Sequence, residues 1–244
     1  MQAFVAVLCA GRPVPEVERR RGGFDALLTA LCPEAWRSAF VGIDVTESAA
    51  SLPSLSEVSA LVVTGSAASV TERTAWMLRV EEYLKRAVEA RLPVLGVCFG
   101  HQMLAQALGG RAAKNPRGRE IGTVLFEPSE KDGVIGRAEP FAVNMTHVDS
   151  AVELPSGARV LGRTALEPHA AIRFAENAYG VQYHPELDGE SMRLYIGARK
   201  AQLDFEGFDV EALTRSASDT PEAASVVARF AELVPSLDWA RRVR

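Results

Sequence analysis

A cysteine held between two glycines is the strongest candidate for a chemical role in this sequence. Cys98 follows an apolar run over residues 93–97, which is typical of a buried strand, and a helix is expected over residues 99–108. Gly96 and Gly100 flank it at two residues on each side and permit a sharp turn between strand and helix. Such a turn would place the thiol at the start of the helix, where backbone N–H groups favour the thiolate. The alternative is a buried structural cysteine, which does not need a glycine on each side.

A histidine and a glutamate near the end of a later apolar run can complete this chemistry. A thiolate nucleophile needs a base to carry protons, and the base needs a group that orients it. His184 and Glu186 stand on either side of Pro185, and in an extended segment such positions point to the same side. A carboxylate there can hold the imidazole and stabilise the imidazolium. Alone, each residue also fits a hydrogen-bonded core histidine or an acid near a helix start, so the prediction depends on their conjunction with Cys98.

Two stretches resemble the signatures of the class I (triad-type) glutamine amidotransferase family. They are residues 93–102, Pro-Val-Leu-Gly-Val-Cys-Phe-Gly-His-Gln, and residues 179–186, Tyr-Gly-Val-Gln-Tyr-His-Pro-Glu. The chain looks like a stand-alone member related to the amidotransferase domain of GMP synthetase. The resemblance implies Cys98 as nucleophile, His184 as base and then acid, and Glu186 as the residue that orients His184. It also implies attack on the γ-carboxamide of glutamine, a γ-glutamyl thioester, and release of ammonia and glutamate.

The same resemblance implies an oxyanion hole. One donor would be the backbone N–H of Phe99, and the other would come from the turn at Gly65 and Ser66. The family often has Gly-Gly-Pro-x-Ser in this turn, whereas this chain has Gly-Ser-Ala-Ala-Ser over residues 65–69. A serine in place of the second glycine restricts the orientation of the peptide, so whether the hole is preformed stays open. The alternative is an ordinary turn at the end of a strand.

The resemblance further implies a glutamine pocket formed by two segments. Gly100 and Gln102 would contribute from the helix after Cys98. Thr146, His147 and Val148 would hold the α-amino and α-carboxylate groups. Gln102 also fits an exposed polar position on a first helical turn, and His147 also fits a strand-end histidine bonded to backbone.

A charged stretch before the second half of the chain resembles a Glu-Ile-Gly segment that lies near the glutamine pocket in related stand-alone members. It covers residues 118–122. Arg117, Arg119 and Glu120 would then shape the entrance for the substrate. The alternative is a charged loop before a strand.

The elements that must position these residues alternate between strand and helix in the first half. This alternation predicts a three-layer α/β/α fold with a mainly parallel central sheet, whose carboxyl edge holds the ligand site. The resemblance implies the flavodoxin-like form of this fold that class I glutamine amidotransferases have. Strands are expected at residues 4–8, 39–45, 58–63 and 93–97, helices at 24–31, 71–91 and 99–108, and a surface loop at 11–23. A smaller antiparallel section is expected from short runs at 122–126, 141–145, 159–161, 170–174 and 180–183, followed by helices at 188–203, 210–215 and 221–233.

The pattern predicts one amidotransferase-like domain over residues 1–203 and a C-terminal helical extension over residues 204–244. The apolar residues of the extension, including Phe230, Leu237 and Trp239, predict that it packs on the same domain. The alternative is that this apolar face contacts a partner or a second copy of the chain, which would form a homodimer.

Composition limits the classes of partner and the compartment. The 244-residue chain has a net charge of −4, which gives no support for a nucleic-acid or membrane partner, and no apolar run is long enough to span a bilayer. Three cysteines are too few for a disulfide framework and favour the cytoplasm. No histidine or cysteine spacing matches a metal site, and the resemblance implies no metal or organic cofactor.

Three functions follow, in order of preference. The first is a glutamine amidotransferase whose ammonia goes to a separate synthetase subunit, because the chain has no phosphate-loop or ATP-site motif. The second is a stand-alone hydrolase of γ-glutamyl peptides or amides that uses the same triad. The third is a regulatory or binding subunit on the same scaffold.

Overall fold

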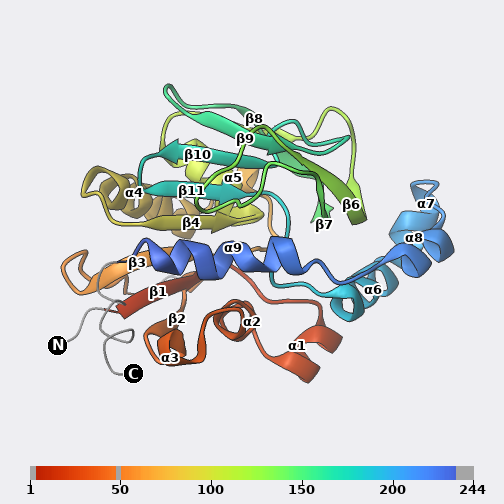
Figure 1. The fold of residues 1–244 in the computed structure, drawn as a ribbon, viewed down its shortest axis with the longest axis horizontal. Helices are drawn as coiled ribbons and strands as arrows, with labels where there is room; N and C mark the ends of the chain where they lie inside the picture. The colour runs from red at the N-terminus through yellow and green to blue at the C-terminus, as the bar shows by residue number, and fades with distance from the viewer. Residues whose placement is uncertain (1–3, 48–50, 235–244) are drawn as a thin grey trace.

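The structure, a computed structural model, describes residues 4–47 and 51–234 (Figure 1). In this part of the chain nine strands form one sheet in the order β2-β1-β3-β4-β11-β10-β9-β6-β7, and β5 and β8 form a separate ribbon. The strands are β1 Phe4–Cys9, β2 Phe40–Asp44, β3 Val58–Val63, β4 Val94–Val97, β5 Arg111–Lys114, β6 Glu120–Pro128, β7 Phe141–His147, β8 Asp149–Glu153, β9 Arg159–Arg163, β10 Ala171–Ala175 and β11 Ala178–Val181.

Helices cover both faces of the sheet. They are α1 Pro15–Arg21, α2 Phe24–Ala30, α3 Glu34–Arg37, α4 Ala75–Glu89, α5 Phe99–Ala107, α6 Gly189–Ala198, α7 Lys200–Phe205, α8 Val210–Ser216 and α9 Pro221–Glu232, with a short 3-10 helix, η1, at Val70–Glu72. No helix in the described ranges is long and apolar enough to cross a membrane.

The sheet has a parallel half and an antiparallel half. Strands β2, β1, β3, β4 and β11 run parallel. Of these, β3 and β4 are almost wholly buried, as expected for central parallel strands, whereas the edge strand β2 is partly exposed. Strands β10, β9, β6 and β7 continue the same sheet with antiparallel pairing. The predicted α/β/α fold with an antiparallel section is therefore confirmed, and that section extends the main sheet.

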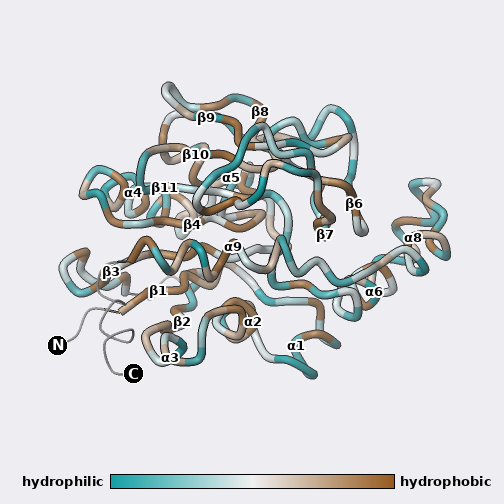
Figure 2. The backbone as a smooth tube through the Cα atoms, viewed as in Figure 1, coloured by the Kyte–Doolittle hydropathy of each residue, from teal (hydrophilic) through white to brown (hydrophobic). Residues whose placement is uncertain are grey.

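Alternating side chains of the central strands build two hydrophobic cores. Val5 and Val7 of β1 face the layer that contains α2, α3 and α9, whereas Ala6 and Leu8 face α4 and α5. Figure 1 shows α9 running across one face of the sheet, and Figure 2 shows hydrophobic residues concentrated along the central strands. Because β3 and β4 pair in parallel, their carboxyl ends lie at the same edge of the sheet.

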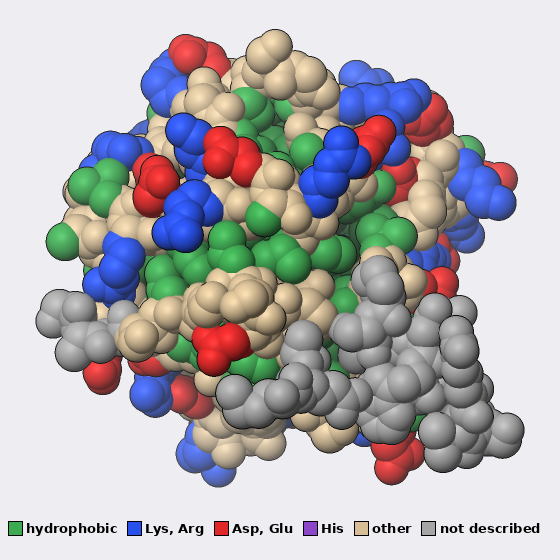
Figure 3. All heavy atoms as spheres, turned by 90° about the vertical axis from the view of Figure 1, so that its left-hand side faces the viewer, with side chains coloured by type: hydrophobic (Ala, Val, Ile, Leu, Met, Phe, Trp, Pro, Cys, Tyr) green, Lys and Arg blue, Asp and Glu red, His purple; other side chains and the backbone are tan. Residues whose placement is uncertain are grey.

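The two ends of the sheet differ. Helices α1, α2, α6 and α8 share a third hydrophobic cluster near the carboxyl edge, at the right of Figure 1. Figure 3 shows the other end, where a band of hydrophobic side chains crosses the surface between charged side chains. Because ligands of such sheets bind at the carboxyl edge, the end near α6 is where a site is expected.

Three local predictions are corrected. Residues 15–21 form helix α1 where a loop was predicted, because Pro15 starts the helix and acids at its start and arginines at its end suit the helix dipole. The helix predicted over residues 71–91 begins at Ala75, because a capping box at Ser69 starts the short helix η1, which ends at Arg73 with a left-handed backbone (φ 49°). The helix predicted over residues 188–203 is divided at Arg199, whose backbone leaves the helical region.

Helix α9 belongs to the hydrophobic core on one face of the sheet. Val226, Val227 and Phe230 are fully buried in the same cluster as side chains of β1, β3 and β4. The predicted boundary at residue 203 falls inside α7, and the division into a domain and an extension stays a prediction. Leu237 and Trp239 lie outside the described residues.

Candidate active site

Cys98 occupies a strained turn between β4 and α5. Its φ of 50° and ψ of −100° are unusual for a residue with a side chain. A Cβ atom on Gly96 would lie 2.4 Å from the Gly100 oxygen, and one on Gly100 would lie 2.3 Å from the Val63 oxygen. Neither position tolerates a side chain, so the turn requires both glycines. This is the sharp strand-to-helix turn that the sequence predicts.

His184 and Glu186 meet in a tight turn after β11. Nδ1 of His184 lies 2.7 Å from Oε1 of Glu186, and both side chains are buried. The segment was predicted to be extended, but the amide of Leu187 bonds back to the carbonyl of His184 at 3.4 Å. Pro185 suits the second position of such a turn. The turn, rather than strand alternation, brings the two side chains together.

The surroundings of His184 favour its charged form. Burial alone would lower the pKa of the imidazole, but the charges of Glu186 and Cys98 and hydrogen bonds to both raise it to about 10. The ring also stacks on Phe24, with centroids 6.3 Å apart. Glu186 and Cys98 on its two sides therefore favour the imidazolium form of His184.

A buried chain of amide side chains reaches the thiol from the other side. Nε2 of Gln102 donates to the Asp149 carbonyl at 2.7 Å and to Oε1 of Gln182 at 3.0 Å. Nε2 of Gln182 donates to Sγ of Cys98 at 3.4 Å. Gln102 is thus buried, not exposed on the first turn of α5. Sequence reasoning did not single out Gln182, although a glutamine inside an otherwise apolar strand end was a signal for it.

The turn after β3 lies against His184 and beside Cys98. A Cβ on Gly65 would lie 2.9 Å from Cε1 of His184, so only glycine allows the imidazole this position. Ser66 Oγ accepts a hydrogen bond from the Ala68 amide at 3.1 Å. Ser66 and Phe99 line the same hollow as Cys98. Their role as oxyanion donors stays a prediction.

Two hollows that share part of their lining open at Cys98 and His184. The Cys98 hollow, of about 320 Å³, is lined by Cys98, Gln102 and Asp149 among others. The His184 hollow, of about 220 Å³, is lined by His184, Phe24 and Tyr195 among others. Four residues line both: Ser66, Ala67, Thr146 and Arg199.

The predicted glutamine-binding residues are brought together only in part. Thr146, His147 and Val148 line the Cys98 hollow, and Thr146 Oγ1 is buried without a hydrogen-bond partner in the described ranges. The His147 ring bonds elsewhere, with Nδ1 2.9 Å from the Asp149 carbonyl and Nε2 3.4 Å from Glu120, which favours the structural alternative. Gly100 lines neither hollow, because it packs against the backbone of β3.

Three arginines line the two hollows: Arg12, Arg119 and Arg199. Arg119 lines the Cys98 hollow and forms an ion pair with Glu206 at 2.7 Å. The Arg199 guanidinium lies 4.9 Å from the centre of the Tyr195 ring, and burial lowers its pKa from the ordinary arginine value. Sequence reasoning missed Arg199, because an arginine on a helical stretch resembles any solvated surface residue.

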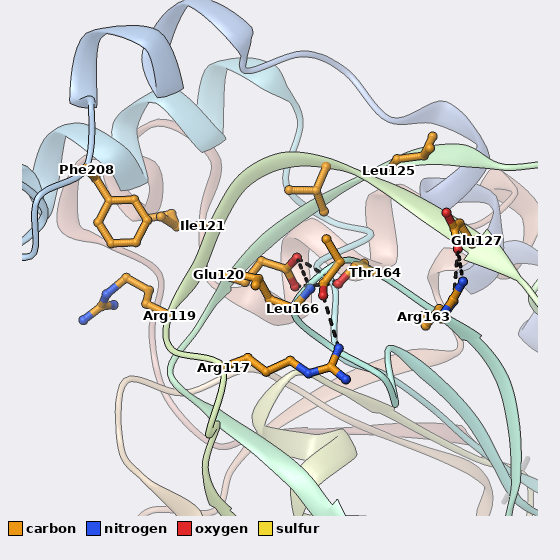
Figure 4. A pocket seen from close by; sticks show the side chains of 12 residues that line it. Arg117, Arg119, Glu120, Ile121, Leu125, Glu127, Arg163, Thr164, Leu166 and Phe208 are labelled. Carbon is orange, nitrogen blue, oxygen red and sulfur yellow. Dashed lines mark hydrogen bonds and ion pairs between the residues drawn. The ribbon is translucent and has the colours of Figure 1, made fainter.

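A third hollow, of about 480 Å³, lies apart from Cys98 (Figure 4). It shares Arg119 with the Cys98 hollow, and Arg117 and Glu120 also line it. Glu120 begins strand β6 and accepts hydrogen bonds from Thr164 at 2.7 and 2.8 Å, so it is no loop residue. Of the predicted entrance residues, only Arg119 reaches the hollow of Cys98. Within residues 4–47 and 51–234, no group of three or more His, Cys, Asp or Glu side chains is arranged to hold a metal ion.

Comparisons with known proteins agree with this geometry. The family model "Glutamine amidotransferase class-I" matches residues 26–200. A GMP synthase (glutamine-hydrolyzing) of Thermosipho melanesiensis is 39% identical over 129 residues, which are 52% of this chain and 24% of the relative. The chain therefore spans about a quarter of the length of that GMP synthase.

Two further relatives match over longer shares of their own length. Gamma-glutamyl peptidase 4 of Arabidopsis thaliana is 28% identical over 140 residues, which are 55% of this chain and 56% of the relative. The crystal structure of a glutamine amidotransferase from Thermotoga maritima shares the fold, with a TM-score of 0.67, 21% identity and coverage of 98% of both chains. From the family match across residues 26–200, together with this shared fold, the chain belongs to the class I glutamine amidotransferase family.

Proposed function

We propose that this chain hydrolyses the γ-carboxamide of glutamine. Cys98 is the nucleophile, His184 is first the base and then the acid, and Glu186 orients His184. The observation that supports this most is the geometry of the three side chains: Cys98 lies in the strained turn at the start of α5, and Nδ1 of His184 lies 2.7 Å from Oε1 of Glu186. Glu186 and Cys98 also raise the pKa of His184 against the opposing effect of burial. An imidazolium paired with a thiolate at a helix start is the arrangement that activates a cysteine nucleophile.

The proposed reaction has two halves with the same residues. His184 takes the thiol proton of Cys98, Sγ attacks the γ-carbon, the C–N bond breaks, and the departing nitrogen receives that proton from His184 and leaves as ammonia. A water then gives a proton to His184, its oxygen attacks the thioester, the S–C bond breaks to release glutamate, and His184 returns the proton to Sγ. Amides of Phe99 and of the Gly65–Ser66 turn would donate to the oxyanion, and one such donor contributes about 3–4 kcal/mol of transition-state stabilisation.

The fate of the ammonia belongs to the same proposal. The GMP synthases among the relatives hydrolyse glutamine, as their name states. This similarity supports the proposal that the ammonia passes to a synthetase subunit. The three free cysteines support a reducing compartment such as the cytoplasm for this reaction.

A second candidate keeps the chemistry and changes the leaving group. The His184 hollow, of about 220 Å³, supports hydrolysis of γ-glutamyl peptides or amides, since ammonia would not need that space. The relative named gamma-glutamyl peptidase 4 supports the same candidate.

The test is glutamate release by the full chain, with Cys98→Ala as the matched blank. Glutamine should give equal amounts of glutamate and ammonia, and Cys98→Ala should lower the rate by about 10⁴-fold or more while its circular dichroism matches wild type. Acid quenching during turnover should trap a γ-glutamyl adduct on Cys98, seen by mass spectrometry. Turnover by Cys98→Ala near the wild-type rate would overturn the proposal.

A further inference from the structure

We infer that Arg199 selects γ-glutamyl substrates whose leaving amine carries a carboxylate, such as an amino acid. This inference rests on the thiol hydrolysis proposed above, and it names the substrate class of that same site. Two features of the site support it: the site is divided into two hollows, and the positive charge of Arg199 lies where they meet.

The two hollows correspond to the two halves of a γ-glutamyl substrate. The carbonyl carbon must lie at Cys98, and the departing nitrogen must receive its proton from His184. Cys98 lines one hollow and not the other, and His184 lines the second and not the first. The glutamyl half therefore occupies the Cys98 hollow, and the leaving amine extends into the His184 hollow.

The His184 hollow is too large for ammonia alone. A water molecule takes up about 30 Å³ in the liquid, and ammonia is of similar size. The hollow offers about 220 Å³. Its walls include Pro13, Val14 and Phe24, which are apolar and at least half-buried. Such walls suit the carbon atoms of a larger amine.

Arg199 supplies an unpaired positive charge where the hollows meet. Three arginines line the hollows, and Arg12 and Arg119 already pair with Glu18 at 2.9 Å and Glu206 at 2.7 Å. The Arg199 guanidinium forms no ion pair with any residue of the described ranges. Its one hydrogen bond within those ranges is to the Tyr195 carbonyl, at 3.4 Å.

The buried, unpartnered hydroxyl of Thr146 lies at the same junction. A half-buried guanidinium beside a free hydroxyl is a binding arrangement for a carboxylate. Because the leaving half of an amino-acid or peptide substrate carries such a group and ammonia does not, the junction distinguishes the two.

The reaction of such a substrate balances with water as co-substrate. For γ-glutamylalanine, Sγ of Cys98 displaces the alanine nitrogen, which takes its proton from His184. Water then cleaves the thioester and restores the proton. The products are glutamate and alanine.

Two substrates that differ by one carboxylate test the inference. γ-Glutamylalanine and γ-glutamylethylamide have the same atoms apart from the carboxylate of the leaving group. We expect wild type to prefer γ-glutamylalanine in kcat/KM by about tenfold or more, and Arg199→Met to abolish that preference mainly through KM. Arg199→Lys should keep part of it. Arg111→Met, which removes an exposed arginine that lines neither hollow, should leave it unchanged.

The outcomes separate this inference from the proposed function. The inference would be overturned if wild type had the same kcat/KM for γ-glutamylalanine and γ-glutamylethylamide. It would also be overturned if Arg199→Met lost the same factor in kcat/KM on both substrates, because Arg199 would then serve the glutamyl half or the thiolate. Hydrolysis of glutamine with no preference for γ-glutamylalanine overturns the inference alone. If wild type hydrolyses neither glutamine nor either γ-glutamyl compound, both the proposed function and the inference are overturned.

Discussion

Nδ1 of His184 lies 2.7 Å from Oε1 of Glu186 inside a turn of four residues. The two side chains are buried, so water screens their interaction little. Their separation is set by the backbone of the turn, which Pro185 stiffens. The carboxylate therefore acts on the imidazole both by charge and by fixing which nitrogen faces Cys98.

The first prediction compares loss of the base with loss of the group that orients it. Both Glu186→Ala and His184→Ala should lower kcat/KM for glutamine, but kcat/KM of Glu186→Ala should stay about 100-fold above that of His184→Ala. The reason is that an imidazole without its carboxylate still carries protons. Steady-state glutamate release measures both variants. Equal losses would show that Glu186 does more than orient His184.

The second prediction concerns the protonation of His184. Its pKa of about 10 lies above the ordinary 6.5, so the charged imidazole contributes to stability in full below pH 6.5. That contribution is lost as pH rises toward 10. An NMR titration of the His184 ring should give a midpoint near 10 in wild type. The midpoint should be lower in Glu186→Gln and in Cys98→Ala, since each removes a group that raises it.

Stability measurements check the same sign. In the Cys98→Ala background no thiol titrates beside the ring. There the free energy of unfolding should fall as the pH rises above about 6.5. The fall should be steeper than in Cys98→Ala/His184→Asn, by at most about 1.4 kcal/mol per pH unit. Parallel pH curves for the two proteins would mean that folding does not raise the pKa of His184.

Local patterns explain why much of the fold was predictable. Residues 58–63 and 93–97 are apolar along their whole length, and the structure places β3 and β4 there, side by side at the centre of the sheet. The turn at Cys98 was predictable because Gly96 and Gly100 act within five residues of each other. Each of these features depends on neighbours in sequence.

Features that depend on distant contacts were not predictable. Gln182 bonds Cys98 across 84 positions, and Arg199 reaches the site from the end of α6. Neither side chain has a local pattern that distinguishes it from a core glutamine or a surface arginine. The same reason applies to helix α1. Its buried Val17 is stabilised by packing against α6, and the short polar stretch around Val17 does not predict that contact.

The third prediction tests the contact beneath the histidine. In Gly65→Ala the new methyl group would lie 2.9 Å from Cε1 of His184, so the ring must move. We expect kcat for glutamine to fall about 100-fold, since a small displacement of a catalytic group has that cost. Gly133→Ala is the matched control, because a Cβ there meets nothing within 4 Å, and its activity should equal wild type. A fully active Gly65→Ala would mean that the turn and the ring do not constrain each other.

The fourth prediction concerns Gln182, whose amide donates to the Cys98 sulfur at 3.4 Å. A hydrogen bond to a charged group contributes about 1.5–3 kcal/mol, which corresponds to a factor of about 10–100. Gln182→Leu should therefore slow alkylation of Cys98 by iodoacetamide at neutral pH by about that factor, and kcat should fall in proportion. Gln106→Leu is the control, since Gln106 lies on the same helix as Gln102 and bonds Glu81 and the Ala112 amide instead of the thiol chain. If both variants were alkylated at the wild-type rate, the buried amide chain would only support packing. A loss confined to Gln182→Leu would instead assign the chain from Asp149 through Gln102 and Gln182 to stabilisation of the thiolate.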